Sequence, residues 1–132
     1  MSLSLGFFHE HTRTDRDNYV TINWDNIKKA SEADGRSWEH NFYKCDQRGC
    51  GDLKVGYDYD SIMHYGRTLK GYDAIVPKNG ASIGQRRYLS AKDLVGINEH
   101  YECPETGKKN INTFIHKCPH ELFYTLMHSI IK

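Results

Sequence analysis

The chain has little net charge and no long hydrophobic run. Its formal charge at pH 7 is +1, so there is no electrostatic case for nucleic acid or an acidic membrane as the main partner. No apolar run approaches the length needed to cross a bilayer. Residues 1–8 are apolar but have neither a basic n-region nor a small-residue cleavage site, so we expect no signal peptide there. A length of 132 residues fits one domain, or part of one.

Glycine and tyrosine, by contrast, are abundant. The chain has eleven glycines, nine tyrosines and 38% hydrophobic residues. This composition favours a loop-rich fold with a modest core over a helical bundle. We expect loops at residues 45–60 and 71–88, with a short hairpin around Asn79-Gly80 in the second of them.

A strand and a helix are predicted in the first third of the chain. Residues 19–22 carry β-branched Val and Ile on one face, which favours a strand. A helix should run from about Trp24 to Ala30, capped by Asn23 or Asp25. The Asp34-Gly35 pair should end it.

The strongest helix signal runs from Ser90 to about Tyr101. Ser90 is a good N-cap, Asp93 stands three residues on, as in a capping box, and apolar residues recur at helical spacing. Cys103-Pro104 should stop the helix. From residue 104 the chain turns into a polar linker and an apolar tail, which we expect to be disordered or helical.

Four cysteines allow three disulfide connectivities. They are Cys45, Cys50, Cys103 and Cys118. The first two could close a small loop. The count is compatible with an oxidising compartment, and the alternative is free thiols in a cytosolic protein.

Two clusters contain residues that could carry chemistry. The first is His9-Glu10-His11; since residues two apart do not share a helix face, a metal would take one of these imidazoles unless the segment is extended. The alternative is a polar loop paired with nearby charges. The second cluster is Tyr59 to Gly66, where Met63 stands in a polar stretch and on composition alone would fill a gap in the core. A third stretch begins His120-Glu121 but has a tyrosine where the H-E-x-x-H zinc motif needs its second histidine.

Together the two clusters resemble the astacin family of metzincin peptidases. Gly6-Phe7-Phe8-His9 matches the last part of the pattern H-E-x-x-H-x-x-G-x-x-H. Residues 10–17 are similar to the astacin extension of that motif, and Ser61-Ile62-Met63-His64-Tyr65 is similar to its Met-turn. The resemblance covers about residues 6–103, in the order and spacing of that family.

The resemblance implies a role for each matching residue. His9 would be the third zinc ligand, and Tyr65 an additional ligand that stabilises the substrate oxyanion. Met63 would form the floor under the metal, Glu10 would receive the mature N-terminus, and Gly6 would make the turn. It further implies zinc as cofactor, a protein or peptide substrate and an extracellular location. The implied fold class is α+β: a loop-rich C-terminal metzincin subdomain with one or two helices, whose N-terminal sheet subdomain is missing.

The sequence also departs from the family pattern. Leu3 stands where the second zinc histidine should be, and the general-base Glu and the first histidine would precede Met1. In the family it resembles, Cys103 pairs with a cysteine near the start of the catalytic domain, and that cysteine is absent here. Cys103 would then lack this partner, unless it forms a disulfide with Cys118 instead. We therefore expect a partial peptidase domain at 1–103, a tail at 104–132, and no hydrolysis by this chain alone.

Two alternatives remain. The chain could be a degenerate, non-catalytic binding or interaction module. It could also be an unrelated metal-binding protein, which would need His11 and His64 to converge with His9; the astacin interpretation needs His9 and Tyr65 to converge over Met63.

Overall fold

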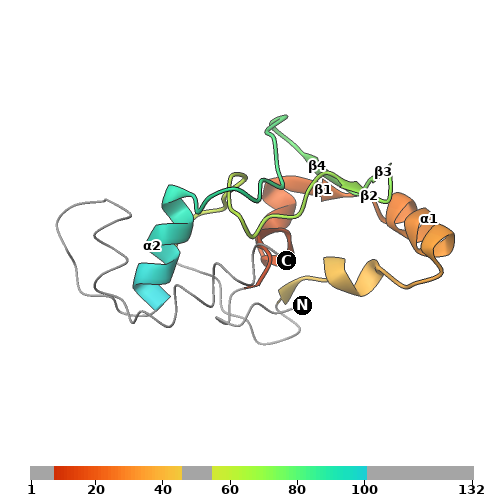
Figure 1. The fold of residues 1–132 in the computed structure, drawn as a ribbon, viewed down its shortest axis with the longest axis horizontal. Coiled ribbons are helices and arrows are strands. Elements are labelled where there is room, and N and C mark those ends of the chain that lie inside the picture. Colours follow the sequence, from red (N-terminus) through yellow and green to blue (C-terminus); the bar gives the residue numbers. More distant parts are fainter. Residues whose placement is uncertain (1–7, 46–54, 101–132) are drawn as a thin grey trace.

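The computed structural model describes residues 8–45 and 55–100, which form a mixed α+β fold. Two α-helices, α1 (Trp24–Asp34) and α2 (Ala91–His100), lie far apart at opposite ends of the view in Figure 1. Between them, within the described residues, run short strands, 3-10 helices and connecting loops. The predicted α+β class is confirmed at this level. None of the helices in the described parts of the chain is long and apolar enough to span a membrane.

The larger of the two small sheets joins segments far apart in the sequence. Strand β1 (Val20–Ile22) pairs antiparallel with β4 (Ile75–Pro77), in the register Val20↔Pro77 and Ile22↔Ile75. The β1 strand was predicted, but β4 falls in a stretch that the sequence pattern assigned to loop. The core is built on this sheet, and its buried members are Val20, Ile27, Phe42, Tyr57, Ala74 and Ile75.

Helix α1 begins and ends where the sequence signals predict. The Asn23 side chain accepts a hydrogen bond from the Asn26 N–H at 3.2 Å, so Asn23 rather than Asp25 is the cap. The helix runs past Ala30, the expected last residue, to Asp34, and the expected stop signal Asp34-Gly35 ends it, with Gly35 at φ of 65°. A left-handed conformation suits glycine, which has no Cβ to clash.

The hairpin lies at a different turn from the predicted one. Strands β2 (Thr68–Leu69) and β3 (Tyr72–Asp73) pair antiparallel across Lys70 and Gly71, whose φ angles are 51° and 86°. Two successive residues with positive φ match the twist of a tight hairpin. Gly80 also turns the chain, with φ of 74°, but the segment before that turn, β4, pairs with β1 instead.

Helix α2 has the predicted capping box. Ser90 Oγ accepts a hydrogen bond from the Asp93 N–H, and the Asp93 carboxylate accepts one from the Ser90 N–H, both at 2.9 Å. Each side chain thus satisfies a backbone donor that the first helical turn leaves free. Tyr101 and the tail lie outside the described residues.

The 3-10 helices carry the residues nearest the candidate site. They are η1 (Glu10–Thr12), η2 (Arg16–Asn18) and η3 (Glu39–Phe42). The buried guanidinium of Arg16 ties them together, because it donates to the carbonyls of His11 and Phe42.

Candidate active site

The carbonyl of Met63 holds the His9 segment in place. His9 Nδ1 lies 3.0 Å from this oxygen, and the Glu10 N–H donates to it at 3.2 Å. A carbonyl can only accept, so Nδ1 carries the proton and Nε2 keeps a free lone pair. Burial lowers the pKa of His9, which keeps the ring neutral. A neutral imidazole oriented through its other nitrogen is the usual form of a metal ligand.

The ring of Tyr65 packs against two imidazoles. Its centroid lies 4.3 Å from that of His9, edge to face, and 4.2 Å from that of His11. The centroid of the Phe42 ring lies 6.0 Å from that of Tyr65. Burial raises the pKa of the half-buried Tyr65 above its ordinary value, and the nearby Arg86 guanidinium opposes this in part. The phenol therefore stays protonated at neutral pH.

His11 is fully buried in this aromatic group. Its Nε2 donates to the carbonyl of Asn41 at 3.1 Å, while its Nδ1 has no hydrogen-bond partner among the residues that the structure describes. Burial holds the pKa of His11 well below its usual range. The ring is therefore neutral, and its nearest ring neighbour among the described residues is Tyr65.

His64 has no lone pair left for a metal. Its Nδ1 lies 2.7 Å from the carbonyl of Tyr65, which can only accept, and its Nε2 lies 2.7 Å from the hydroxyl of Tyr57, which donates to it. Burial lowers the pKa of His64 to about 4. The alternative metal site of His9, His11 and His64 is therefore not supported by this geometry.

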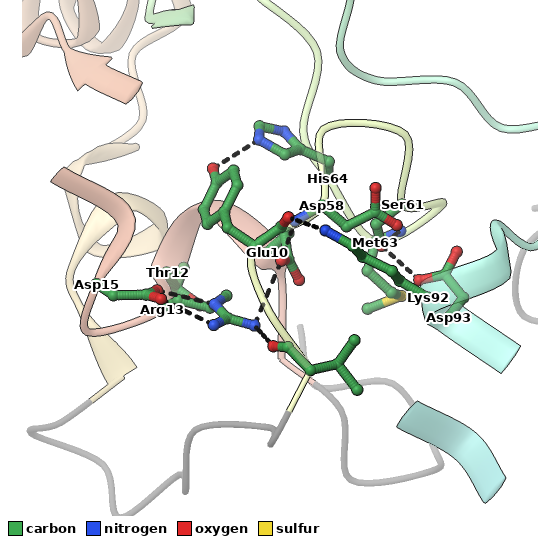
Figure 2. Close-up of polar contacts among 12 residues, drawn as sticks. Glu10, Thr12, Arg13, Asp15, Asp58, Ser61, Met63, His64, Lys92 and Asp93 are labelled. Carbon is green, nitrogen blue, oxygen red and sulfur yellow. Dashed lines mark hydrogen bonds and ion pairs between the residues drawn. The ribbon is translucent and has the colours of Figure 1, made fainter. Parts of the chain in front are cut away.

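Glu10 is buried, and its carboxylate lies beside the backbone of Asp58 (Figure 2). Its carboxylate accepts the Asp58 N–H at 2.8 Å and lies 3.5 Å from the Arg13 guanidinium. Burial raises the pKa of Glu10 to about 7, although the Asp58 hydrogen bond and Arg13 pull it down. The alternative of a polar loop holds only in part: the charges do pair, but Glu10 and His11 are buried.

Three residues at the site were not found from the sequence. Asp93 binds Ser61 and Ile62 in the Met-turn, Arg86 donates to the carbonyls of Ile62 and His64, and Tyr57 binds His64. Only Asp93 had a sequence signal, and that signal concerned the helix cap. The Asp93 bonds join the second helix to the Met-turn.

The remaining predicted residues fall partly outside the described chain. Cys45 is buried and disulfide-bonded, while Cys50 lies outside the described residues, as do Gly6, Leu3 and His120. The pairing of Cys45 with Cys50 therefore stays a prediction.

The donors present fit part of a zinc site. His9 offers a free imidazole nitrogen and Tyr65 a phenol beside it, whereas a catalytic zinc takes three protein ligands. Within residues 8–45 and 55–100, no group of three or more His, Cys, Asp or Glu side chains could hold a metal ion. These residues thus supply two donor positions and leave the others unfilled.

Known proteins are similar to this chain over most of its length. The family model described as Astacin, a peptidase family, matches residues 1–102. The chain is 42% identical to zinc metalloproteinase nas-15 of Caenorhabditis elegans over 110 residues, which are 80% of this chain and 18% of that protein. It is 45% identical to the low choriolytic enzyme of Oryzias latipes over 105 residues, 76% of this chain and 35% of the enzyme.

A solved structure is similar as well. High choriolytic enzyme 1, a hatching enzyme zinc-protease from Oryzias latipes, matches with a TM-score of 0.61 and 44% identity, over 75% of this chain and 48% of that one. Fold and relatives thus place the chain within part of a zinc-protease domain. The chain belongs to the astacin family of peptidases. It spans about a fifth to a third of the length of nas-15 and the low choriolytic enzyme.

Proposed function

We propose that this chain supplies part of the active site of a zinc metalloendopeptidase, with His9 and Tyr65 as its metal donors. The observation that carries the proposal is the approach of these two rings to 4.3 Å, beside the Met63 carbonyl that binds His9. Membership of the astacin family supports zinc as the metal and a protein or peptide as the substrate. The disulfide at Cys45 supports an extracellular setting.

The chain's own residues have separable tasks in this proposal. Zinc, when bound, polarises a carbonyl and lowers the pKa of a bound water to about 7. Met63 forms the floor, and its carbonyl fixes the tautomer of His9. Tyr65 stays protonated and can donate a hydrogen bond to a developing oxyanion. Glu10 has its carboxylate bound to Asp58 and Arg13, so it serves structure here rather than proton transfer.

We further propose that these 132 residues alone do not hydrolyse peptides. The printed sequence has no H-E-x-x-H motif, and loss of a general base alone costs about 10²–10⁴ in rate. Two protein donors also give a site far weaker than the roughly 10–16 kcal/mol of a four-ligand structural zinc site. The same observations favour a second candidate function, a non-catalytic binding or interaction module.

A chimera separates the two candidates. Residues 8–100 would replace the matching segment of high choriolytic enzyme 1, so that the rest of that protease domain is present. We expect peptide hydrolysis that a chelator abolishes, and its loss in His9→Ala. Tyr65→Phe should lower kcat by about 10²–10³, the usual cost of removing one oxyanion donor.

The matched control is Tyr72→Phe, which removes a hydroxyl from an exposed tyrosine in β3 and should leave the rate unchanged. A folded chimera whose rate is the same with Phe at position 65 would contradict the role given to Tyr65. Chelator-sensitive turnover by the 132 residues alone would contradict the proposed inactivity.

A further inference from the structure

Side chains at the start of α2 form hydrogen bonds with the segment that leads into the Met-turn. Lys92 Nζ donates to the carbonyl of Tyr57 at 2.8 Å, Ser90 Oγ donates to the carboxylate of Asp58, and Asp93 reaches the turn itself. Figure 2 shows Asp93 and Lys92 reaching from α2 toward this segment. Three side chains on one helical turn therefore hold a segment some thirty residues away in the sequence.

Asp93 does more than a capping residue needs to do. A capping box requires its carboxylate to accept only the backbone N–H of Ser90. Here one carboxylate oxygen also accepts the N–H of Ile62 at 3.0 Å, and the other accepts the hydroxyl of Ser61 at 2.6 Å. Ser61 is 1% exposed. The bonds to Ser61 and Ile62 therefore join α2 to the Met-turn through a buried serine.

The hydroxyl of Ser61 connects Asp93 to the backbone of Met63 through two hydrogen bonds. Ser61 Oγ accepts the N–H of Met63 at 3.0 Å while it donates to Asp93. The carbonyl of Met63 in turn accepts His9 Nδ1 and the Glu10 N–H. Both peptide groups that flank the Met63 Cα are thus hydrogen-bonded. The N–H before the Cα is bonded to Ser61, which binds Asp93, and the carbonyl after it is bonded to His9 and Glu10.

We propose that Asp93 is a positioning residue for His9. Acting through Ser61, it fixes the direction of the Met63 carbonyl, and that carbonyl keeps the imidazole proton on Nδ1 and leaves Nε2 free for a metal. The inference rests on the proposed function for the identity of the ligand that Nε2 would take. The hydrogen-bond chain itself can be tested without any metal.

The test is the tautomer of His9, read by long-range ¹H–¹⁵N NMR of the imidazoles in the full 132-residue chain at about pH 8, above the ordinary imidazole pKa. His9→Ala assigns the signal among the eight histidines. In the parent chain we expect the Nδ1–H form. Asp93→Ala and Ser61→Ala should shift His9 toward the Nε2–H form that free imidazole prefers in water.

If Asp93→Ala fails to fold, Ser61→Ala still allows the tautomer of His9 to be measured, because it leaves the Ser90–Asp93 capping box intact. Asn23→Ala is the matched control: it removes the N-cap of α1, which is not part of the hydrogen-bond chain from Asp93 to His9, and we expect it to lower stability only. Far-UV circular dichroism reports which variants are folded.

One set of results supports the role of Asp93, and another overturns it. A tautomer shift in the folded Ser61 variant but not in Asn23→Ala supports the proposal. It is overturned if His9 keeps Nδ1–H in that variant, or if the control shifts His9 equally. Failure of the proposed function would look different, because loss of His9 or Tyr65 would then leave the activity of the chimera unchanged whatever the tautomer of His9.

Discussion

Tyr57 donates its phenolic proton to Nε2 of His64 across 2.7 Å, and both side chains are buried. The other nitrogen of His64 donates to the carbonyl of Tyr65. The imidazole thus links the Tyr57 segment to the backbone of a proposed zinc donor. Removal of either partner would leave a buried polar atom without a hydrogen bond.

The first prediction concerns that hydrogen bond. Tyr57→Phe keeps the ring, which stacks on Tyr19 at 4.5 Å, but leaves Nε2 of His64 unpaired. An unsatisfied buried acceptor costs about 1–3 kcal/mol, so urea denaturation should give that loss in the free energy of unfolding. Tyr88→Phe, at an exposed tyrosine bound to Asp60, should change stability by less than about 0.5 kcal/mol. Equal effects of the two substitutions would mean that the buried bond contributes nothing.

The second prediction compares two glycines with the same backbone angle. Gly84 and Gly71 both have φ of 86°, but a Cβ on Gly84 would lie 2.3 Å from the Cα of Gly66, whereas a Cβ on Gly71 would meet nothing within 4 Å. Gly71→Ala should cost only the left-handed strain of about 1–2 kcal/mol. Gly84→Ala must also push apart two backbones next to Tyr65, so we expect a further loss of about 1–3 kcal/mol.

Equilibrium unfolding of the two variants against the parent chain measures this difference. If Gly84→Ala were no more destabilising than Gly71→Ala, the close approach of the residue 84 segment to the Met-turn would be absent in solution.

Local signals in the sequence predicted local structure well. Asn23 and Gly35 mark the ends of α1, and Ser90 with Asp93 marks the start of α2, because caps depend on residues a few positions apart. Strand β4 was missed, since it is defined by its pairing with β1 on a distant part of the chain. The Asn79-Gly80 pair suggested a hairpin, but that signal holds only where both flanking segments pair with each other.

Some residues of the candidate site could also be predicted from the sequence, and others could not. His9, Met63 and Tyr65 came from the resemblance of two motifs, and the structure brings the three together. The sequence could not indicate that His11 would pack on Tyr65 or that Tyr57 would bind His64. Those relationships depend on tertiary packing, which leaves no periodic or spacing signal in a single sequence.

The third prediction concerns acid stability. Arg13 binds Asp15 through two hydrogen bonds of 2.8 Å, and these bonds hold the pKa of that carboxyl below its ordinary value. The stabilisation is fully present above the unfolded-state pKa of about 3.9 and is lost as the pH falls through the lower folded-state pKa. Asp15→Asn should therefore lower stability at neutral pH, by about 0.5 kcal/mol for a partly exposed pair, and change it little in strong acid.

Urea denaturation of Asp15→Asn at neutral pH and near pH 2, against the parent chain, measures this effect. Glu32→Gln, at an exposed position on α1, serves as control for the removal of one carboxyl charge. A loss for Asp15→Asn that is the same at both pH values would show that something other than the ion pair is responsible.

The fourth prediction concerns the core that carries the site. Ile27 is fully buried in α1 and belongs to the same cluster as Val20, Phe42 and Ile75. Ile27→Ala removes apolar surface and leaves a cavity, which costs about 2–5 kcal/mol, while Ile27→Val should cost about 0.5–1.5 kcal/mol. Val95→Ala, at a residue 44% exposed on α2, should stay within about 0.5 kcal/mol. Urea denaturation of the three variants gives these values.

The same substitutions test whether the core and the candidate site are coupled. Because Phe42 also packs against Tyr65, a loss at Ile27 should loosen the Tyr65 ring as well. Broadening of the Tyr65 ring signals in NMR of Ile27→Ala but not of Val95→Ala would reveal that coupling. Sharp, unshifted Tyr65 signals in a destabilised Ile27→Ala would mean instead that the core and the candidate site respond independently.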